Sequence, residues 1–412
     1  MPPPADVVVV LALAGMLAVA FGHPRGRVEA SIGVVCAGAT LATGLLTVDQ
    51  ARDAVDHLAP VVAFLVTILV VADVCARAGL FEVAAQWVGR WSGDSAVRLF
   101  TGVFALAAVV TATLSLDATV VLLTPVVLAA ALARSVPDEP ATYACLRMAN
   151  SASLLLPVSN LTNLLAIPHT DLTFTGFAVR MAPVLAVVLL VEYAGLRLLF
   201  RGRLAVRPTG GGDGRPDPVP VFPLVVVLLM LAGFAVVSPI GGEPWWVSSV
   251  AALVLVAWAH RRSLLRPIHI LHAMHPGFAI WVLALGVVVA GLAQGFLGDA
   301  VQDVVPATTS LDALLGIAVL STLLANVLTN LSATLLLVPV VAPLGSTAVL
   351  AALLGLNIGS GLTWSGSLAN LLWRRTLRRH GVRPGTAAFH RVSLTLTPIS
   401  LLAAVLVLWA VG

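Results

Sequence analysis

Residues 357–375 read NIGSGLTWSGSLANLLWRR, a run rich in glycine, serine, threonine and asparagine within a strongly apolar chain. A helix that spans lipid must satisfy its backbone N–H and C=O groups internally, so such an interruption belongs where protein or a water-filled cavity satisfies the freed groups. Many transporters build their substrate sites from helices broken at membrane depth. The stretch therefore predicts one half of a transport site.

A second stretch, residues 150–165 (NSASLLLPVSNLTNLL), has nearly the same layout. In both stretches an Asn-x-x-Ser motif is followed at identical spacing by Asn-Leu-Leu: Asn150, Ser153 and Asn163 in one, and Asn357, Ser360 and Asn370 in the other. Inverted repeats that meet at a binding site are typical of secondary transporters. The rest of the chain is expected to bring the two stretches together.

The composition restricts the class of protein. Of 412 residues, 59% are hydrophobic and 10% are charged, which predicts a polytopic integral membrane protein. The basic residues are all arginines in short loops, so the net charge of +4 does not indicate nucleic acid binding. Without lysine the chain has no P-loop, and no histidine lies near the serines of the two stretches to form a nucleophile–base pair. Neither an enzyme nor a cofactor is expected.

Ten apolar segments are long enough to be membrane spans. They cover about 6–21, 28–47, 59–80, 141–168, 176–200, 220–239, 245–260, 277–296, 346–372 and 386–411. Two further apolar blocks, 97–134 and 310–345, each carry a polar tip in the middle. Such blocks can be pairs of spans, or re-entrant hairpins that return to the same membrane face.

The distribution of arginine distinguishes these alternatives. With re-entrant hairpins and the N-terminus outside, the arginines fall almost entirely in inside loops, as the positive-inside rule requires. The inside set is Arg25, Arg27, Arg77, Arg90, Arg98, Arg134, Arg147, Arg201, Arg203, Arg207, Arg215, Arg261, Arg262, Arg266, Arg374, Arg375, Arg378, Arg379 and Arg383. The outside loops carry Asp49, Asp53, Asp56, Asp171, Glu243, Asp299 and Asp303, with Arg52 as the exception. Glu192 is expected near the inner surface.

The sequence thus predicts an all-α inverted-repeat secondary transporter with about ten spanning helices, two re-entrant hairpins and two broken helices. The first repeat is residues 1–205, with its hairpin at 97–134 and its broken helix at 141–168. A cytoplasmic linker, 206–219, leads to the second repeat, 220–412, with its hairpin at 310–345 and its broken helix at 346–372. An amphipathic interfacial helix is expected at 81–91, and an ion pair between Asp73 and Arg77.

The two tips and two breaks would meet near one point and offer hydroxyl, amide and freed backbone groups to a substrate. The predicted ligands are Ser115, Thr119, Asn150, Ser153, Ser159, Asn160, Thr162, Asn163, Asn326, Thr329, Asn330, Ser332, Thr334, Asn357, Ser360, Thr363, Ser365, Ser367 and Asn370. The alternative is that these small polar residues only allow close helix packing, as they often do in membranes. No metal site is expected.

Asp117 is the one carboxylate in a tip or break, and no arginine accompanies it there. An acidic residue within a membrane is a functional candidate, because its burial is costly. Asp117 disfavours an anionic substrate and favours a cation, a proton or a neutral polyhydroxyl solute. It is predicted to carry a proton. A role in capping the returning helix of the hairpin is an alternative that does not exclude this one.

Three segments resemble the arsenical pump membrane proteins, the arsenite efflux permeases of the ion transporter superfamily. They are MANSASLLLPVSNLTNLLAIP (148–168), NVLTNLSATLLLVPVVAPLG (326–345) and NIGSGLTWSGSLANLLWRR (357–375). The resemblance implies an inverted-repeat fold and the exchange of As(OH)₃ or Sb(OH)₃ for protons, alone or with a soluble ATPase. Asp117 matches the aspartate of the family's first hairpin tip.

Alternatives of other kinds stay open at this point. A sodium/proton antiporter could use Asp117 and the hydroxyl groups to bind a cation, and the chain could be the membrane subunit of an ATP-driven arsenite pump. A dicarboxylate symporter ranks lower, because Asp117 would repel its substrate. The expected partners are arsenite or antimonite, protons and lipid, with a soluble ATPase and a homodimer left open. The expected location is the inner (plasma) membrane, with both termini outside and the basic loops cytoplasmic.

Overall fold

The computed structural model describes residues 3–22, 26–209 and 216–412, which form helices joined by short turns and contain no strand. In these ranges, seven helices are long and apolar enough to cross a membrane by length and composition, and shorter apolar helices accompany them. Arg25, Arg215 and the central part of the predicted linker 206–219 lie outside the described residues. The predicted all-α polytopic fold is confirmed.

Eight of the ten predicted spans are single helices. They are α1 (Pro4–Gly22), α2 (Gly26–Ala42), α3 (Val48–Arg77), α9 (Phe174–Leu199), α11 (Val221–Val237), α12 (Pro244–Arg261), α14 (Pro276–Ala293) and α20 (Thr386–Val411). Helix α3 begins earlier than predicted, because Thr47 and Gln50 form a capping box before its polar first turns. Its 30 residues are about 45 Å long, more than the hydrocarbon thickness.

Short helices connect the spans. They are α4 (Leu80–Ser92), α10 (Arg201–Leu204), α13 (Pro267–Ala273) and α15 (Phe296–Val304), with a 3₁₀ turn η5 (Ser238–Ile240). Helix α4 confirms the helix expected at 81–91, since it buries Phe81 and exposes Trp87 and Trp91. The predicted ion pair is present, with Arg77 Nε 2.6 Å from Asp73 Oδ2.

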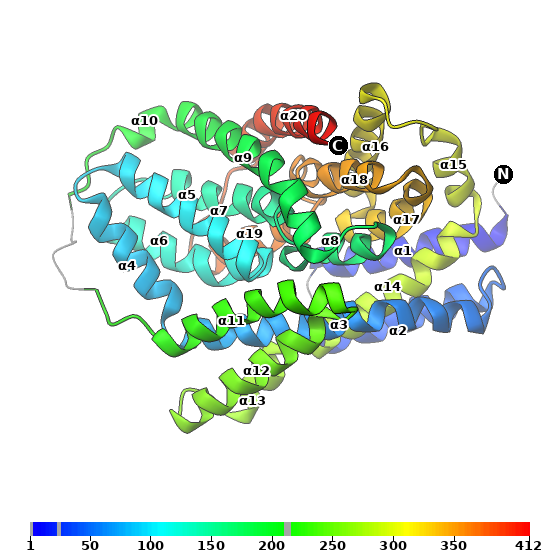
Figure 1. The fold of residues 1–412 in the computed structure, drawn as a ribbon, viewed down its shortest axis with the longest axis horizontal. Helices are drawn as coiled ribbons and strands as arrows, with labels where there is room; N and C mark the ends of the chain where they lie inside the picture. Colours follow the sequence, from blue (N-terminus) through cyan, green and yellow to red (C-terminus); the bar gives the residue numbers. More distant parts are fainter. Residues whose placement is uncertain (1–2, 23–25, 210–215) are drawn as a thin grey trace.

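Both apolar blocks with a polar tip fold as helical hairpins. The first consists of α5 (Ala96–Thr113), a π-helical turn η1 (Ala118–Leu123) and α6 (Thr124–Ala133). The second consists of α16 (Leu311–Leu328), α17 (Asn330–Val341) and a 3₁₀ turn η6 (Ala342–Leu344). The first lies in the left half of the molecule and the second in the right half (Figure 1). That they are re-entrant, and the membrane face from which each enters, stay predictions.

Both broken spans are interrupted where the sequence predicts. The first consists of α7 (Glu139–Ser151), η2 (Ala152–Leu154), η3 (Pro157–Ser159), α8 (Leu161–Ala166) and η4 (Ile167–His169). The second consists of α18 (Ser346–Asn357), η7 (Gly359–Gly361) and α19 (Leu368–Arg379). Asn160 and Ser367 restart the two helices, since their side chains accept the backbone N–H of Thr162 and Ala369.

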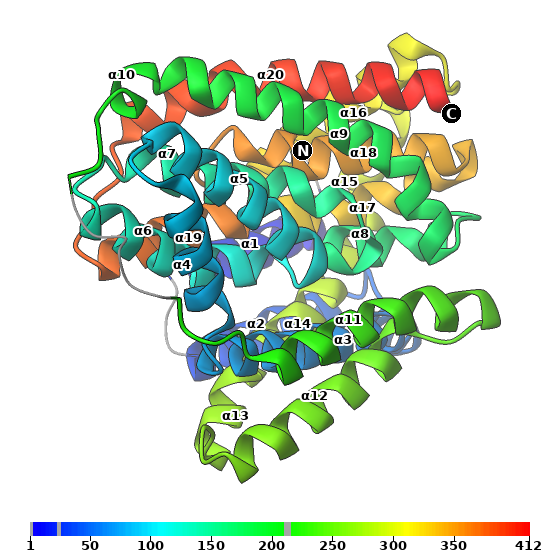
Figure 2. The same cartoon turned by 60° about the vertical axis from the view of Figure 1, so that its left-hand side comes forward.

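Long helices enclose the hairpins and broken spans from two sides. Helices α9 and α20 pack together along one side, and α2, α3, α11, α12 and α14 lie along the other (Figures 1 and 2). The hairpins and broken spans therefore occupy the middle of the molecule. The division into repeats at 1–205 and 220–412 stays a prediction.

Two glycines let α18 and the η7 turn that follows it approach α16 closely. A Cβ atom at Gly355 would lie 2.2 Å from the carbonyl oxygen of Ala318, and one at Gly359 would lie 2.0 Å from Thr322 Oγ1. Small residues four apart on a helix allow such backbone approach in membranes. The glycines of this region therefore set helix packing as well as breaking a helix.

Gly355→Ala is expected to destabilise the protein by about 1–3 kcal/mol, because the added methyl group overlaps a backbone atom that cannot rotate away. Thermal unfolding of the purified protein in detergent measures the change in Tm. Gly38→Ala is the matched control, since a Cβ atom there meets no atom within 4 Å. A Tm of Gly355→Ala equal to that of the control would contradict this packing.

The structure corrects the expected position of Arg147. It is expected in an inside loop, but it lies in α7, where its side chain is 1% exposed and forms an ion pair with Glu192, whose side chain is 0% exposed. Counting charges along the sequence cannot reveal this, because the partners lie in different helices, α7 and α9. The position of Glu192 relative to the inner surface stays a prediction. Arg134 is also buried, at the end of α6, where it bonds Ser92 Oγ and Gly93 O.

Candidate functional site

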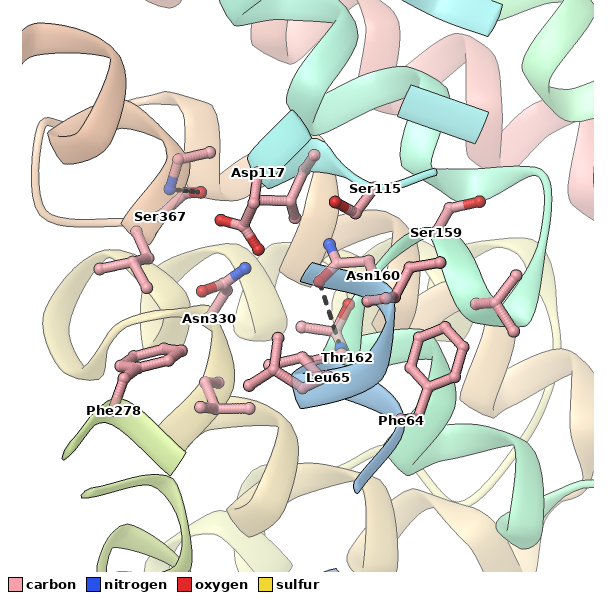
Figure 3. Close-up of a pocket in the computed structure, with 17 residues that line it drawn as sticks. Phe64, Leu65, Ser115, Asp117, Ser159, Asn160, Thr162, Phe278, Asn330 and Ser367 are labelled. Atoms are coloured by element: carbon pink, nitrogen blue, oxygen red, sulfur yellow. Dashed lines mark hydrogen bonds between the residues drawn. The ribbon is translucent and has the colours of Figure 1, made fainter. Parts of the chain in front are cut away.

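A small cavity lies where the two hairpin tips meet the two breaks (Figure 3). Its volume is about 50 Å³. A water molecule needs about 10–15 Å³ by the same measure, so the cavity has room for a solute of a few heavy atoms. Seven predicted site residues line it: Ser115, Asp117, Ser159, Asn160, Thr162, Asn330 and Ser367. Residues from both halves of the chain therefore form one cavity.

Among the residues that the structure describes, Asp117 is the only charged one that lines this cavity. Its carboxylate points into the cavity and, within the described residues, has no basic partner and makes no cap hydrogen bond. Ser115 Oγ caps the turn instead, by accepting the Ala118 N–H at 3.2 Å. The alternative interpretation of Asp117 as the cap of the returning helix is thus not realised. The carboxylate is free to interact with a solute.

The second tip places Asn330 on the cavity wall through an unusual backbone. Thr329 has φ 72° and ψ 154°, a region that residues other than glycine rarely adopt and that costs about 1–3 kcal/mol. The Asn330 N–H donates to the carbonyl oxygen of Gly366 at 3.0 Å, which ties the tip to the second break. The Asn330 carbonyl accepts the Thr334 hydroxyl at 2.6 Å. The Asn330 carboxamide itself faces the cavity (Figure 3).

Other side chains of the cavity wall are already engaged with protein groups. Asn160 Nδ2 and Thr162 Oγ1 both donate to Asn357 Oδ1 at 2.7 Å. Ser159 Oγ donates to the carbonyl oxygen of Ala112 at 2.6 Å. Four groups are thereby left for a solute: the Asp117 carboxylate, the Asn330 carboxamide and the hydroxyl protons of Ser115 and Ser367. Together they offer both donors and acceptors.

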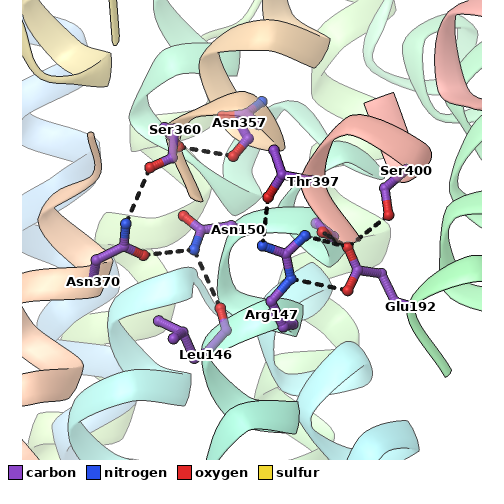
Figure 4. A network of polar contacts seen from close by, with 10 residues as sticks. Leu146, Arg147, Asn150, Glu192, Asn357, Ser360, Asn370, Thr397 and Ser400 are labelled. Atoms are coloured by element: carbon purple, nitrogen blue, oxygen red, sulfur yellow. Dashed lines mark hydrogen bonds and ion pairs between the residues drawn. The ribbon is translucent and has the colours of Figure 1, made fainter. Parts of the chain in front are cut away.

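The repeated asparagines bind one another across the two breaks. Asn150 Nδ2 donates to Asn370 Oδ1 at 2.9 Å, and Asn357 Nδ2 donates to Asn163 Oδ1 at 2.8 Å. The first of these bonds is visible in Figure 4. Each bond joins the first part of one broken helix to the second part of the other. The motif that repeats in the sequence therefore forms a reciprocal brace, named here the asparagine brace.

The closing asparagine of each break also holds its own broken backbone. Asn163 Nδ2 donates to the carbonyl oxygens of Ser153 and Leu156, at 2.7 and 3.1 Å. Asn370 Nδ2 donates to those of Ser360 and Thr363, at 3.0 and 2.8 Å. Carbonyls freed by each break are thus satisfied by an amide from the returning helix.

The remaining predicted ligands bond protein groups and do not line the cavity in this conformation. Ser153 and Ser360 donate to the carbonyl oxygens of Asn150 and Asn357, both at 2.8 Å. Thr119 shares a hydrogen bond with Thr111 at 2.7 Å. Five more belong to the second tip and break: Asn326, Thr329, Ser332, Thr363 and Ser365, which bond one another or nearby backbone.

Sequence reasoning missed the apolar part of the cavity. Phe64, Leu65 and Ile68 of α3 and Phe278 of α14 also line it. These residues lie in uniformly apolar segments, where no local pattern separates a cavity wall from a lipid-facing surface. The cavity therefore combines polar groups of the tips and breaks with apolar side chains of the enclosing helices.

Curated relatives and a solved structure resemble this chain over nearly its whole length. The chain is 28% identical to an arsenical pump membrane protein of Escherichia coli over 90% of each chain. It is 26% identical to one of Yersinia enterocolitica, over 92% of this chain and 93% of the relative. The resemblance expected from the motifs is thus confirmed. The crystal structure of the Alcanivorax borkumensis YdaH transporter, described as having an unusual topology, covers 99% of this chain and 98% of its own, with a TM-score of 0.62 and 17% identity.

The sequence profile described as citrate transporter, CitMHS, matches residues 7–349. This match covers the first hairpin, the first break and the second hairpin, and it ends within α18, before the second break. Together with the helical fold, it makes the protein a multi-pass membrane transporter. The chain belongs to the citrate transporter (CitMHS) family.

Proposed function

We propose that the protein is a secondary transporter that extrudes arsenite or antimonite, as neutral As(OH)₃ or Sb(OH)₃, in exchange for protons. One observation carries this proposal: a cavity of about 50 Å³ in which, within the described part of the chain, the one charged lining group is the unpaired carboxylate of Asp117. The printed names of the relatives in Escherichia coli and Yersinia enterocolitica support the choice of substrate.

The chemistry of the cavity suits a small neutral trihydroxyl solute. The hydroxyl groups of As(OH)₃ can donate to Asp117 and accept from Asn330, Ser115 and Ser367. A cationic clamp, which an anion would require, is absent from the cavity lining. The solute would thus bind both the hydrogen-bond donors and the acceptor of the cavity.

Exchange follows if one carboxylate serves both the substrate and the proton. The ionised Asp117 accepts strong hydrogen bonds from substrate hydroxyls. Protonation removes the charge and weakens these bonds, so proton binding favours release of the solute. We infer that Asp117 binds either a proton or the solute in each half of the cycle, which gives antiport.

The family description makes citrate the second candidate substrate. A tricarboxylate needs a larger site and positive charge, whereas this cavity is small and carries a negative group. A sodium/proton antiporter would also use Asp117, and a dedicated ATPase would make the chain one subunit of a pump. One transport experiment separates all of these candidates.

The test uses the purified full chain in proteoliposomes with only a pH gradient imposed. We expect arsenite-dependent proton flux and gradient-driven arsenite movement without any second protein. Proton flux with sodium alone, or uptake of citrate in place of arsenite, would overturn the proposed substrate. Arsenite transport that needs ATP and a soluble ATPase would overturn the secondary mechanism.

Asn330→Ala is expected to raise the KM for arsenite about tenfold with little change in Vmax, since a hydrogen bond to solute is worth about 1 kcal/mol or somewhat more. Initial rates of arsenite transport against arsenite concentration measure it. The matched control is Ser159→Ala, because this hydroxyl also lines the cavity but already bonds the carbonyl oxygen of Ala112. Equal KM values for the two variants would count against Asn330 as a ligand.

A further inference from the structure

The first broken helix carries one member of a buried ion pair that the transport mechanism above does not use; the other member lies on α9. Arg147 lies on α7, one turn before Asn150, and donates from Nε to Glu192 Oε2 at 2.9 Å and from Nη2 to Glu192 Oε1. Both side chains are buried (Figure 4). The geometry is that of a bidentate arginine–carboxylate pair, which fixes both groups in orientation.

Further hydrogen bonds extend the pair to a third helix. Arg147 Nη1 donates to Thr397 Oγ1 at 2.9 Å, and Ser400 Oγ donates to Glu192 Oε1 at 2.8 Å. Ser151 Oγ, at the end of α7, also reaches Glu192 Oε1 at 3.4 Å. The pair therefore fastens the first broken helix to α9 and α20, the two long helices that pack together along one side of the molecule.

The second broken helix touches the same guanidinium. A Cβ atom added at Gly361, in the η7 turn, would lie 2.8 Å from Arg147 Nη1 and 3.6 Å from Thr397 Oγ1. Only glycine thus allows the second break to rest directly against Arg147. One buried side chain of the first broken span thus lies against the second break, one turn before Asn150 of the asparagine brace.

The arrangement is not repeated in the second half. At the spacing that relates Asn150 to Asn357, the counterpart of Arg147 is Leu354, which is buried and apolar. A buried ion pair contributes little stability compared with apolar residues of similar volume, so stability alone is a weak reason for this one. Its place beside Gly361 of the second break points instead to a role in how the two broken helices pack.

We propose that Arg147, held by Glu192, is a positioning residue that sets the second break against the first through Gly361, and so sets the shape of the transport cavity. The effect on arsenite transport rests on the proposed function. The coupling between Arg147 and Gly361 does not rest on it, because this coupling is a property of the folded protein. The experiment therefore measures both the KM for arsenite and the Tm.

The first set of variants is Gly361→Ala, the double change Arg147→Met with Glu192→Leu, and the three changes together. Gly361→Ala is expected to raise the KM for arsenite about tenfold and to lower the Tm, because the methyl group displaces the break from the guanidinium. In the background without Arg147, the same substitution is expected to change KM less than about twofold and to leave the Tm unaltered.

Equal effects of Gly361→Ala in both backgrounds would overturn the proposal. A double variant with a lower Tm but an unchanged KM would also overturn it, since the pair would then only stabilise the fold. If the double variant does not fold, the single variants Glu192→Gln and Glu192→Ala are compared instead, because the glutamine amide oxygen can still accept from Arg147 whereas alanine cannot. A KM close to that of the unaltered protein in Glu192→Gln, with a raised KM in Glu192→Ala, supports positioning. Equal KM values in the two variants exclude it.

Failure of the two proposals can be told apart. If the protein transports another solute, the Tm measurements still report the coupling of Gly361 to Arg147. If the coupling is absent, arsenite transport by the unaltered chain is unaffected.

Discussion

Asp117→Asn is expected to abolish proton-driven arsenite transport while the protein remains folded. Asparagine keeps the size of the side chain and can still donate and accept hydrogen bonds, but it cannot bind or release a proton. The hydrogen bonds between a carboxylate and the solute are worth about 1.5–3 kcal/mol, so arsenite affinity should also fall roughly 10- to 100-fold. Everted vesicles or proteoliposomes with a pH gradient show both effects.

The position of Asp117 predicts that the fold tolerates this change. The carboxylate makes no cap hydrogen bond, and Ser115 holds the turn in its place. Removal of the charge leaves no buried cation without a partner, because no basic residue lines the cavity. The Tm of Asp117→Asn should match or exceed that of the unaltered protein.

Asp117→Glu is the informative control. It keeps the titrating group but moves it by one methylene, so partial proton coupling should return with a higher KM for arsenite. Full pH-gradient-driven accumulation by Asp117→Asn would exclude Asp117 as the proton carrier. Loss of transport in every variant together with a lower Tm would show that Asp117 supports the fold instead.

The sequence predicted the helical framework well, because the signals are local. Apolar runs of about the length of a bilayer define the spans, and glycine and serine mark the breaks. The helices of the ten apolar segments and of the two hairpins can be found in this way, and amphipathic alternation indicates the helix at 81–91. Helix α3 began earlier than predicted because a capping box, Thr47 with Gln50, extends it into polar sequence.

The candidate site was predicted by region but not by role. The repeated Asn-x-x-Ser…Asn-Leu-Leu pattern located both breaks, yet its asparagines bind each other instead of facing the cavity. Sequence spacing cannot tell a ligand from a brace, since both need a polar group at a break. The pairing of Arg147 with Glu192 depends on the packing of α7 against α9, which no local pattern encodes.

The asparagine brace predicts that Asn357 contributes more to stability than Asn150, its counterpart in the repeat. Asn357 Oδ1 accepts from Asn160 and Thr162, and Asn357 Nδ2 donates to Asn163. At the equivalent of Asn160 and Thr162 the second half has Ser367 and Ala369. These two residues take part in the N-cap of α19, through the bond from the Ala369 N–H to Ser367 Oγ at 3.1 Å. Asn150 therefore donates to Asn370 Oδ1 and Leu146 O. Within the described residues, its side-chain oxygen accepts no pair of hydrogen bonds like the pair that Asn357 accepts from Asn160 and Thr162.

Asn357→Ala is therefore expected to destabilise the protein by about 3–6 kcal/mol, because it leaves several buried polar groups without partners at roughly 1–3 kcal/mol each. Asn150→Ala should have a smaller effect, about 1–3 kcal/mol, since it deprives mainly Asn370 of a partner. Thermal unfolding in detergent measures both, and both variants remove the same side chain from a buried helix end. Equal losses would mean that the donors Asn160 and Thr162 contribute nothing to the brace, and that the two halves of the site are energetically as symmetric as the repeated motif.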